Sequence, residues 1–303
     1  MHVFVTGGSG QTGPAVVAEL VAAGHTVTAL ARSDTAAARL EALGATPHQG
    51  SLDDLDSLRD GAEAAEGVLH MAYGGDFSDL DDMMRRDRTA IETLGRPLEH
   101  SGKPLVVTSG TLVMPAGRES TEHDEPDPAG IAAFRIAGER ACLGFADRGV
   151  RASVVRLAPT VHGPQDHGFI PMLIATARKT GVCAHVGDGT NRWPAVHRLD
   201  AAVLFRLALE EAPPGSVLHG VGESGVTMRS IAQTIARGLE LPTVALTPDE
   251  AAGHFANPFM ATVYGFDGPV SSAYTRELLG WSPRHATLLE DLEHGDYLTA
   301  PAP

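Results

Sequence analysis

Three glycines near the start of the chain have the spacing of a dinucleotide-binding turn. Gly7, Gly10 and Gly13 follow an apolar strand pattern and precede an amphipathic helical pattern. Glycine has no Cβ, so these positions allow a sharp turn, close approach of the backbone to a pyrophosphate, and tight packing of helix on strand. The free amides at the start of the helix favour phosphate. We therefore predict that this turn, including Gln11 and Thr12, binds a dinucleotide.

The end of the predicted second strand, Thr26–Ala31, carries Arg32 and Ser33. In a dinucleotide-binding fold this strand end reaches the adenosine ribose, where an acidic residue accepts from the 2′-hydroxyl and an arginine receives a 2′-phosphate. A guanidinium can pair bidentately with phosphate. The sequence thus favours NADP over NAD, with a solvated surface arginine as the alternative interpretation.

The turn after the predicted third strand contains Ser51 and Leu52. Polar side chains and free amides in such a turn could hold the edge of the adenine. Ser51 could equally be a helix N-cap, with Asp54 completing a capping box three residues later. The two roles are compatible, so both residues are counted as cofactor-binding candidates.

Hydroxyl groups gather at the ends of two further predicted strands. Val68–Ala72 is followed by Tyr73, and Pro104–Ser109 ends in a cluster that continues to Thr111. Parallel strands deliver their carboxyl ends to the crevice where doubly wound folds bind ligands. Met71, Ala72 and Tyr73 are therefore expected at the cofactor, and Ser109, Thr111 and Tyr73 are candidate catalytic hydroxyls.

Strands and helices alternate along the first half of the chain. This cadence predicts an α/β fold, a doubly wound parallel Rossmann sheet with helices on both faces. Beyond about Phe169 the cadence changes to helices with short strands. We expect residues 1–168 to be mainly the nucleotide-binding domain, and residues 169–303 to be mainly a smaller C-terminal substrate-binding lobe with elements that return to the Rossmann sheet.

Two segments could form either core or contact surface. The charged helical pattern over residues 76–98 carries Met83, Ile91 and Leu94 on one stripe, and the predicted connection His254–Asp267 is rich in aromatic residues. Either could contact a second subunit, so a homodimer stays open, or fill the core. A substrate lid is the third interpretation of the aromatic segment.

The composition limits the classes of partner. The 303 residues carry a formal net charge of −15, which disfavours nucleic acid and anionic membranes as partners. No apolar run reaches the ~18 residues of a spanning helix, and no signal peptide is evident. Cys142 and Cys183 lack metal-ligand spacing and are expected in the core, so no metal site is predicted. A cytoplasmic protein acting on a small molecule is expected.

These motifs together resemble the short-chain dehydrogenase/reductase superfamily, in its extended and atypical branch related to the NAD-dependent epimerases and dehydratases. Besides the glycine-rich turn and the hydroxyl strand end, the resemblance rests on Arg156–Pro164, Trp193–Asp200 and Leu278–Pro283, and it covers nearly the whole chain. It implies a Rossmann fold, and it implies that the loop containing Pro159, Thr160 and Val161 reaches the nicotinamide.

The chain departs from this family at its usual proton donor. The family normally carries Tyr-x-x-x-Lys with a glutamate four residues beyond the lysine. If Glu139 is that glutamate, Arg135 takes the lysine position and Ile131 the tyrosine position. Arg135 could still hold the nicotinamide ribose, but arginine is a poor proton donor. The replacement donor is left open among Ser109, Thr111, Tyr73, His162 and His167.

Three functions are consistent with these residues. The leading hypothesis is an NADP-dependent oxidoreductase that reduces a carbonyl or related group of a small organic molecule by hydride transfer. An epimerase, dehydratase or isomerase that retains its nucleotide is a second, although such enzymes normally rely on the tyrosine that is absent. A non-catalytic NADP(H)-binding sensor or scaffold is the third.

Overall fold

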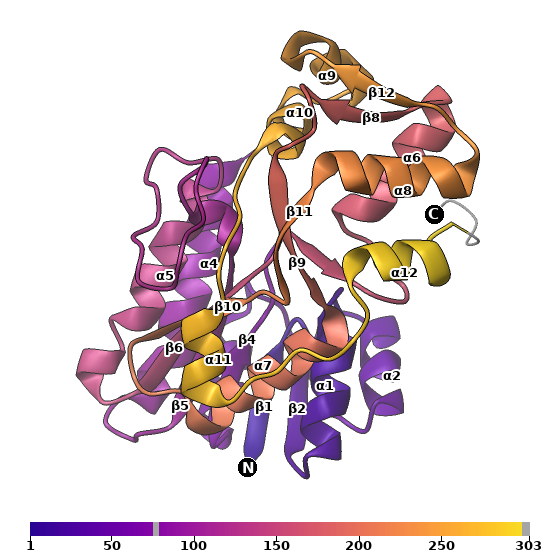
Figure 1. Cartoon of the computed structure of the whole chain (residues 1–303). Helices are drawn as coiled ribbons and strands as arrows, with labels where there is room; N and C mark the ends of the chain where they lie inside the picture. Colours follow the sequence, from indigo (N-terminus) through magenta and orange to yellow (C-terminus); the bar gives the residue numbers. More distant parts are fainter. Residues whose placement is uncertain (75–78, 299–303) are drawn as a thin grey trace.

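The computed structural model describes residues 1–74 and 79–298. A seven-stranded sheet lies between two layers of helices in the lower part of Figure 1, and a smaller lobe lies above it. All pairings within the large sheet are parallel. The predicted doubly wound α/β fold is therefore confirmed.

The strand order of the large sheet creates a crevice at its centre. The order is β10 (Ser216–Gly220), β6 (Arg151–Leu157), β5 (Pro104–Gly110), β4 (Gly67–His70), β1 (His2–Thr6), β2 (Thr26–Ala31) and β3 (Thr46–Gln49). The chain proceeds outward from β1 to β3 and then returns to the other side of β1 with β4. Ligands bind outside the carboxyl ends of the strands at such a reversal point. Here that point lies between β1 and β4.

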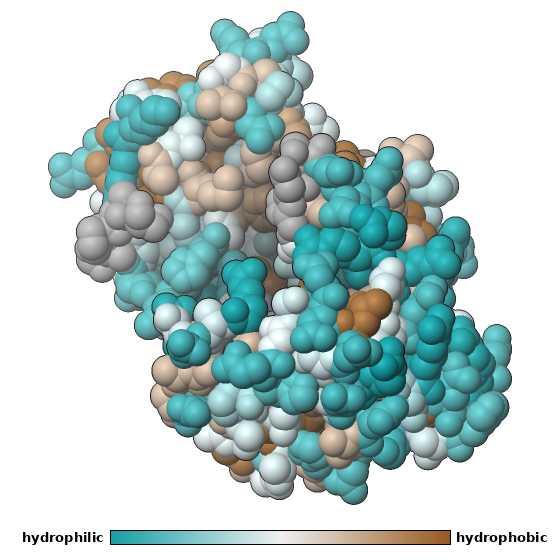
Figure 2. All heavy atoms as spheres, turned by 180° about the vertical axis from the view of Figure 1, so that it is seen from behind, coloured by the Kyte–Doolittle hydropathy of each residue, from teal (hydrophilic) through white to brown (hydrophobic). Residues whose placement is uncertain are grey.

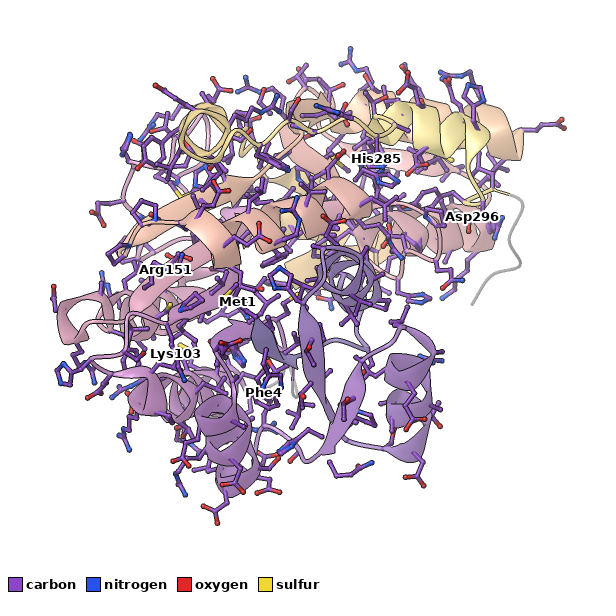
Figure 3. All side chains as sticks on the ribbon, turned by 90° about the horizontal axis from the view of Figure 1, so that it is seen from below. Met1, Phe4, Lys103, Arg151, His285 and Asp296 are labelled. Atoms are coloured by element: carbon purple, nitrogen blue, oxygen red, sulfur yellow. The ribbon has the colours of Figure 1, made fainter. Side chains whose placement is uncertain are left out.

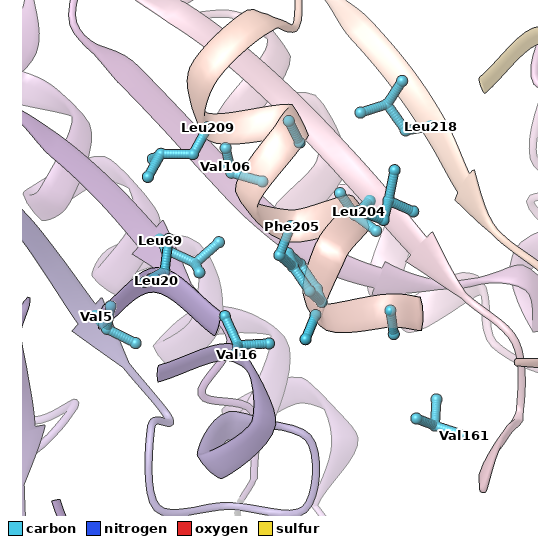
Figure 4. Close-up of a cluster of buried hydrophobic side chains, with 14 of the residues drawn as sticks. Val5, Val16, Leu20, Leu69, Val106, Val161, Leu204, Phe205, Leu209 and Leu218 are labelled. Carbon is cyan, nitrogen blue, oxygen red and sulfur yellow. The ribbon is translucent and has the colours of Figure 1, made fainter. Parts of the chain in front are cut away.

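One face of the sheet is covered by α1 (Gly13–Ala22), α2 (Asp34–Ala42) and α7 (Arg198–Glu211). Figure 4 shows Val16 and Leu20 of α1 and Phe205 of α7 in one apolar cluster with Leu69 and Val106 of the sheet. Parallel strands buried on both faces need such near-continuous apolar runs. The α7 helix and β10 both come from the second half of the chain, so that half contributes to this core.

The other face is covered by α3 (Leu55–Ala64), α4 (Leu80–Gly95) and α5 (Ile136–Leu143). Residues 75–78, on which the predicted start of the fourth helix falls, lie outside the described residues. Met83, Ile91 and Leu94 are buried here, so this stripe belongs to the core of the subunit. A buried ion pair ties α5 to β6, with Arg156 Nη2 donating to Glu139 Oε2 at 2.7 Å and Nε to Oε1 at 3.0 Å.

The smaller lobe packs around an aromatic centre. Trp193 and Tyr264 stack with ring centroids 5.6 Å apart, and the apolar face of α8 (Met228–Leu239) packs against them. The other strands of the lobe form two small sheets. One contains β7 (Thr160–His162), β9 (Arg192–His197) and β11 (Glu223–Thr227), and the other contains β8 (Cys183–Val186) and β12 (Thr243–Leu246). The other helices of the lobe are α6 (Phe169–Thr180), α9 (Pro248–His254), α10 (Pro258–Gly265) and α12 (Leu288–His294). The α11 helix (Ala273–Leu279) packs on β10 instead.

Two predicted elements differ in the structure. The helix expected over residues 131–148 is broken, because 3₁₀ turns at Ala133–Arg135 and Ala146–Arg148 flank α5. The aromatic segment over residues 254–267 is not an irregular connection, since it contains α10, whose N-cap Asn257 accepts from the amides of Phe259 and Met260. Tyr264 and Met260 are buried in the lobe, which favours the core interpretation over a lid.

The outer surface is mostly polar. Hydrophilic residues cover most of the face shown in Figure 2. Within the described ranges, no helix combines the length and the apolar character that crossing a membrane requires. Cys142 and Cys183 are both buried and unpaired, as the sequence predicts.

The buried ion pair gives a test of this packing. We expect Glu139→Ala to lower the free energy of unfolding by about 3–5 kcal/mol, because it leaves the Arg156 guanidinium buried without a counter-charge. The matched control is Glu99→Ala, which removes the exposed partner of Arg148 and should cost about 1 kcal/mol or less. Urea denaturation measures both values, and equal losses for the two variants would contradict the assignment.

Candidate functional site

A cavity of about 900 Å³ lies at the carboxyl ends of the central strands, between the large sheet and the smaller lobe. It is lined by most of the residues that the sequence predicts for a cofactor. These are Gly7, Gly10, Gln11, Thr12, Gly13, Arg32, Ser51, Leu52, Met71, Ala72, Tyr73, Arg135, Pro159 and Val161. Its lining includes Arg32 just after β2 and Phe169 and Met172 at the start of α6.

In the glycine-rich turn, Gly7 and Gly13 lie so close to neighbouring backbone atoms that there is no room for a side chain. Gly7 has a φ of +77°, and a Cβ there would lie 2.6 Å from the amide nitrogen of Ala72. A Cβ on Gly13 would lie 2.1 Å from the carbonyl oxygen of Gly7. Thr12, the N-cap of α1, makes no side-chain cap, so the amides of the first helical turn stay available. This is the donor set that a pyrophosphate requires.

The end of the cavity near β2 carries two arginines, of which one is paired with a carboxylate and the other is not. Arg86 of α4 pairs bidentately with Asp53, through Nε at 2.7 Å and Nη2 at 2.6 Å. Arg32 is exposed and makes no ion pair with any described residue. Its guanidinium is therefore the available cation at the position where the sequence places a 2′-phosphate.

Two predicted cofactor residues do not line the cavity. Ser33 does not line the cavity, and its hydroxyl caps α2 by accepting from the amide of Ala36. Thr160 is buried in β7 and also stays out of the lining. Ser51 lines the cavity, but the predicted capping box is wrong: Asp54 is the N-cap of α3 and accepts from the amide of Ser57.

Tyr73 and Arg135 lie against each other at the centre of the cavity. The guanidinium carbon of Arg135 is 3.4 Å from the centroid of the Tyr73 ring. Arg135 Nη2 also donates to the Thr108 carbonyl oxygen at 2.5 Å, which fixes the guanidinium over the ring. The ring of Phe134 stacks with the ring of Tyr73, with the two centroids 6.4 Å apart. The phenol is thus held by a cation and an aromatic ring.

Four hydroxyls in this part of the cavity lack partners. The side-chain oxygens of Tyr73, Thr108, Ser109 and Thr111 are buried and accept or donate no hydrogen bond with the described residues. Buried polar groups are normally paired, so such a cluster indicates a site for a polar ligand atom. Burial raises the pKa of Tyr73, and the charge of Arg135 opposes that rise. The phenol is protonated at neutral pH and can act as a donor.

Comparisons with known proteins agree with this geometry. A model of the NAD dependent epimerase/dehydratase family matches residues 3–219. The chain is 44% identical to the uncharacterized protein C2A9.02 of Schizosaccharomyces pombe, over 98% of this chain and 100% of that protein.

The chain belongs to the NAD dependent epimerase/dehydratase family.

Two further proteins that this chain resembles have named activities. A 4-hydroxy-2-methyl-3-oxo-4-farnesyl-3,4-dihydroquinoline-1-oxide ketoreductase of Stigmatella aurantiaca is 31% identical, over 76% of this chain and 71% of its own length. The structure of DesIV, a dTDP-glucose 4,6-dehydratase of Streptomyces venezuelae with NAD and TYD bound, superposes with a TM-score of 0.79. It is 18% identical over 98% of this chain and 96% of that one, so it shares the extended fold.

The three residues that the resemblance aligns with the family's tyrosine, lysine and glutamate lie in different parts of the structure. Ile131 is half-buried, packs against the apolar cluster of the smaller lobe and does not line the cavity. Glu139 is committed to Arg156. Of the three positions that the resemblance aligns, only Arg135 reaches the cavity, and it does so beside Tyr73.

Neither histidine candidate lies at this centre. His162 is buried in β7 and its Nδ1 is 2.7 Å from Asp291 Oδ2, on the side of the smaller lobe. His167 is exposed on the loop that follows. Since neither lines the cavity, the structure favours the hydroxyl candidates over the histidines as hydrogen-bond donors.

The end of the chain anchors the loop between β7 and α6. The Tyr297 hydroxyl donates to Asp166 Oδ2 at 2.7 Å and accepts from the amide of Gly163 at 3.2 Å. Asp166 Oδ1 in turn accepts from Gln11 Nε2 at 2.6 Å. Figure 3 labels the neighbouring residue Asp296, which lies at the edge of the molecule. This chain of bonds holds Gln11 of the glycine-rich turn in place.

Several lining residues were not found from the sequence. Asp53, Arg86, Phe134, Phe169 and Met172 all face the cavity. Asp53 follows the predicted pair Ser51 and Leu52 directly, so its place beside the cavity could have been inferred. The others lie on helices or 3₁₀ turns whose orientation depends on packing between distant segments, and no local pattern marks them.

The anchored loop generates a prediction about cofactor affinity. If the cavity holds a nicotinamide dinucleotide, we expect Tyr297→Phe to weaken its binding by about 3- to 10-fold, because the bonds of the hydroxyl to Asp166 and from Gly163 are lost and Asp166 then holds Gln11 less firmly. Fluorescence titration with NADPH measures the change. Tyr274→Phe is the matched control, since the Tyr274 ring contacts His123 outside the cavity. Unchanged affinity in Tyr297→Phe would show that the anchor does not reach the cofactor.

Proposed function

We propose that this protein is an NADP-dependent reductase that transfers hydride to a carbonyl carbon of a small organic molecule. The observation that carries the proposal is the buried, unpartnered hydroxyl of Tyr73 beside Arg135, in a cavity built around a dinucleotide-binding turn. The ketoreductase activity named for the Stigmatella relative supports the same type of reaction.

The described residues fit a nicotinamide dinucleotide along the whole cavity. The glycine-rich turn and the uncapped start of α1 would hold the pyrophosphate, Ser51 and Leu52 the adenine, and Arg32 a 2′-phosphate. When bound, the reduced nicotinamide supplies the hydride. In this proposal residues 1–168 bind mainly the nucleotide, and residues 169–303 mainly the substrate.

Tyr73 supplies the proton in this mechanism. Hydride addition to the carbonyl carbon breaks the carbon–oxygen π bond and leaves the electron pair on oxygen, which takes the phenolic proton of Tyr73. The phenolate then recovers a proton from water. A phenol is far more acidic than an aliphatic alcohol even when burial raises its pKa, so the transfer is favourable in the direction of reduction.

Arg135, Ser109 and Thr111 support this step without donating the proton. The Arg135 guanidinium stays charged, and its position over the ring stabilises the phenolate that forms. The hydroxyls of Ser109 and Thr111 lie unpartnered at the end of β5, where they can donate hydrogen bonds to the carbonyl oxygen. Tyr73 thereby takes over the task that the family's tyrosine performs from the position of Ile131.

The preference for NADP is tested at Arg32. We expect Arg32→Gln to raise the KM for NADPH by about 10- to 100-fold, because a charge-assisted contact to the 2′-phosphate is lost, and to leave the KM for NADH unchanged. Arg39→Gln, which changes an exposed arginine of α2 outside the cavity, should change neither value. An equal effect of Arg32→Gln on both cofactors would contradict the assignment.

The proton donor is tested at Tyr73. We expect Tyr73→Phe to lower kcat for a carbonyl substrate by about 10²- to 10⁴-fold, with little change in the Kd for NADPH. Ser109→Ala and Thr111→Ala should each have a smaller effect on kcat. If wild-type protein binds NADPH but oxidises none of it across a broad carbonyl panel, the protein is a non-catalytic NADP(H) sensor, the function that the loss of the usual tyrosine favours. Cofactor that copurifies and shows no net redox change would favour an epimerase or dehydratase instead.

A further inference from the structure

The end of the cavity beyond Tyr73 is apolar. Three segments supply its apolar lining: the 3₁₀ turn after β5 (Thr111–Val113), the 3₁₀ turn before α5 (Ala133–Arg135) with its N-cap residue, and the start of α6. The side chains that they contribute there are Leu112, Ala132, Phe134, Phe169 and Met172. This is the part of the cavity that the proposed reductase leaves for its substrate.

The two aromatic rings at this end are fixed by their neighbours. Phe169 meets Trp193 edge to face, with ring centroids 5.5 Å apart, and its carbonyl oxygen accepts from the Tyr264 hydroxyl at 3.2 Å. Phe134 is stacked with Tyr73 at an interplanar angle of 20°. Rings held in this way offer flat apolar surfaces with little entropy left to lose on binding.

Positive charge is scarce at this end. Of the described residues that line the cavity, the cationic ones are Arg32, Arg86 and Arg135. Arg86 is neutralised by Asp53 at the other end, where Arg32 also lies. Arg135 is committed to the Tyr73 ring and the Thr108 carbonyl. A carboxylate or diphosphate placed among Phe134, Phe169 and Met172 would therefore lose part of its hydration, and Arg135, the cation nearest in sequence to Phe134, is already held by the Tyr73 ring and the Thr108 carbonyl, so binding of such an anion is costly.

Met172 forms the outer edge of this apolar surface. It lies on the first turn of α6 and its side chain is 45% exposed, although it faces the cavity. An unbranched, polarizable side chain at that place can pack on ligands of different shape. Its exposure also means that it can be replaced without disturbing the core of the lobe.

We propose that the substrate is an uncharged, apolar aldehyde or ketone whose flat, aromatic or unsaturated part packs between Phe134, Phe169 and Met172. We expect nucleotide sugars and carboxylated carbonyl compounds to bind poorly, because the described residues at this end of the cavity offer their negative charge no cation besides Arg135. The inference rests on the proposed carbonyl reduction and adds the chemical class of the substrate to it.

The test compares two aldehydes of similar shape, one uncharged and one that carries a carboxylate. Purified full-length protein is assayed with NADPH and either 4-methylbenzaldehyde or 4-carboxybenzaldehyde, and binding of each aldehyde to the NADP⁺-loaded protein is measured separately by calorimetry. We expect kcat/KM and affinity to favour the methyl compound by about 10-fold or more. Met172→Lys should reduce that preference several-fold, since it supplies the missing counter-charge.

Phe259→Lys is the matched control. Phe259 is also 45% exposed, but it lies on α10 outside the cavity, so the same added charge should leave the preference unchanged. Equal or better binding of the carboxylate by wild-type protein overturns the substrate class, and so does turnover of UDP-glucose. Preferential binding of the methyl compound without NADPH oxidation by any aldehyde would leave the apolar selectivity standing and reject the proposed reduction.

Discussion

The close approach of the glycine-rich turn to the end of β4 is the constraint on which the rest of the site depends. Gly7 packs directly on the backbone of Met71 and Ala72, and Gly13 packs on Gly7 and Gly8. These contacts bring the free amides of α1 and the residue after Ala72 to the same crevice. The residue after Ala72 is Tyr73, so the geometry that suits a pyrophosphate also delivers a phenol to the cofactor cavity.

Three effects on the ionisation of Tyr73 act at the centre of the site, and one of them opposes the other two. Burial disfavours the Tyr73 phenolate, the guanidinium of Arg135 favours it, and the negative charge of Asp87 disfavours it again. The result is a hydroxyl that keeps its proton at neutral pH yet has a cation in place to stabilise the charge once the proton leaves. In the proposed mechanism, this arrangement supplies the proton donor of a chain that has isoleucine at the family's tyrosine position.

Much of the framework could be predicted from the sequence. The glycine spacing, the buried strand runs and the position of Arg32 are local patterns, and each lies where expected. The pairing of Arg86 with Asp53 and the stacking of Phe134 on Tyr73 could not be predicted, since they join segments that only tertiary packing brings together. Ser51 shows a further limit, because Ser51 and Asp54 both satisfy the rules for a helix cap and the sequence does not say which one is used.

The most direct test of the proposed proton transfer is a crystal structure of the protein with NADP⁺ and a product alcohol such as 4-methylbenzyl alcohol. The mechanism predicts the Tyr73 hydroxyl at about 2.6–3.2 Å from the alcohol oxygen, and the methyl-substituted ring of the ligand between Phe134 and Phe169. An alcohol oxygen that is bonded by Ser109 or Thr111 alone, with the Tyr73 hydroxyl out of reach, would contradict it.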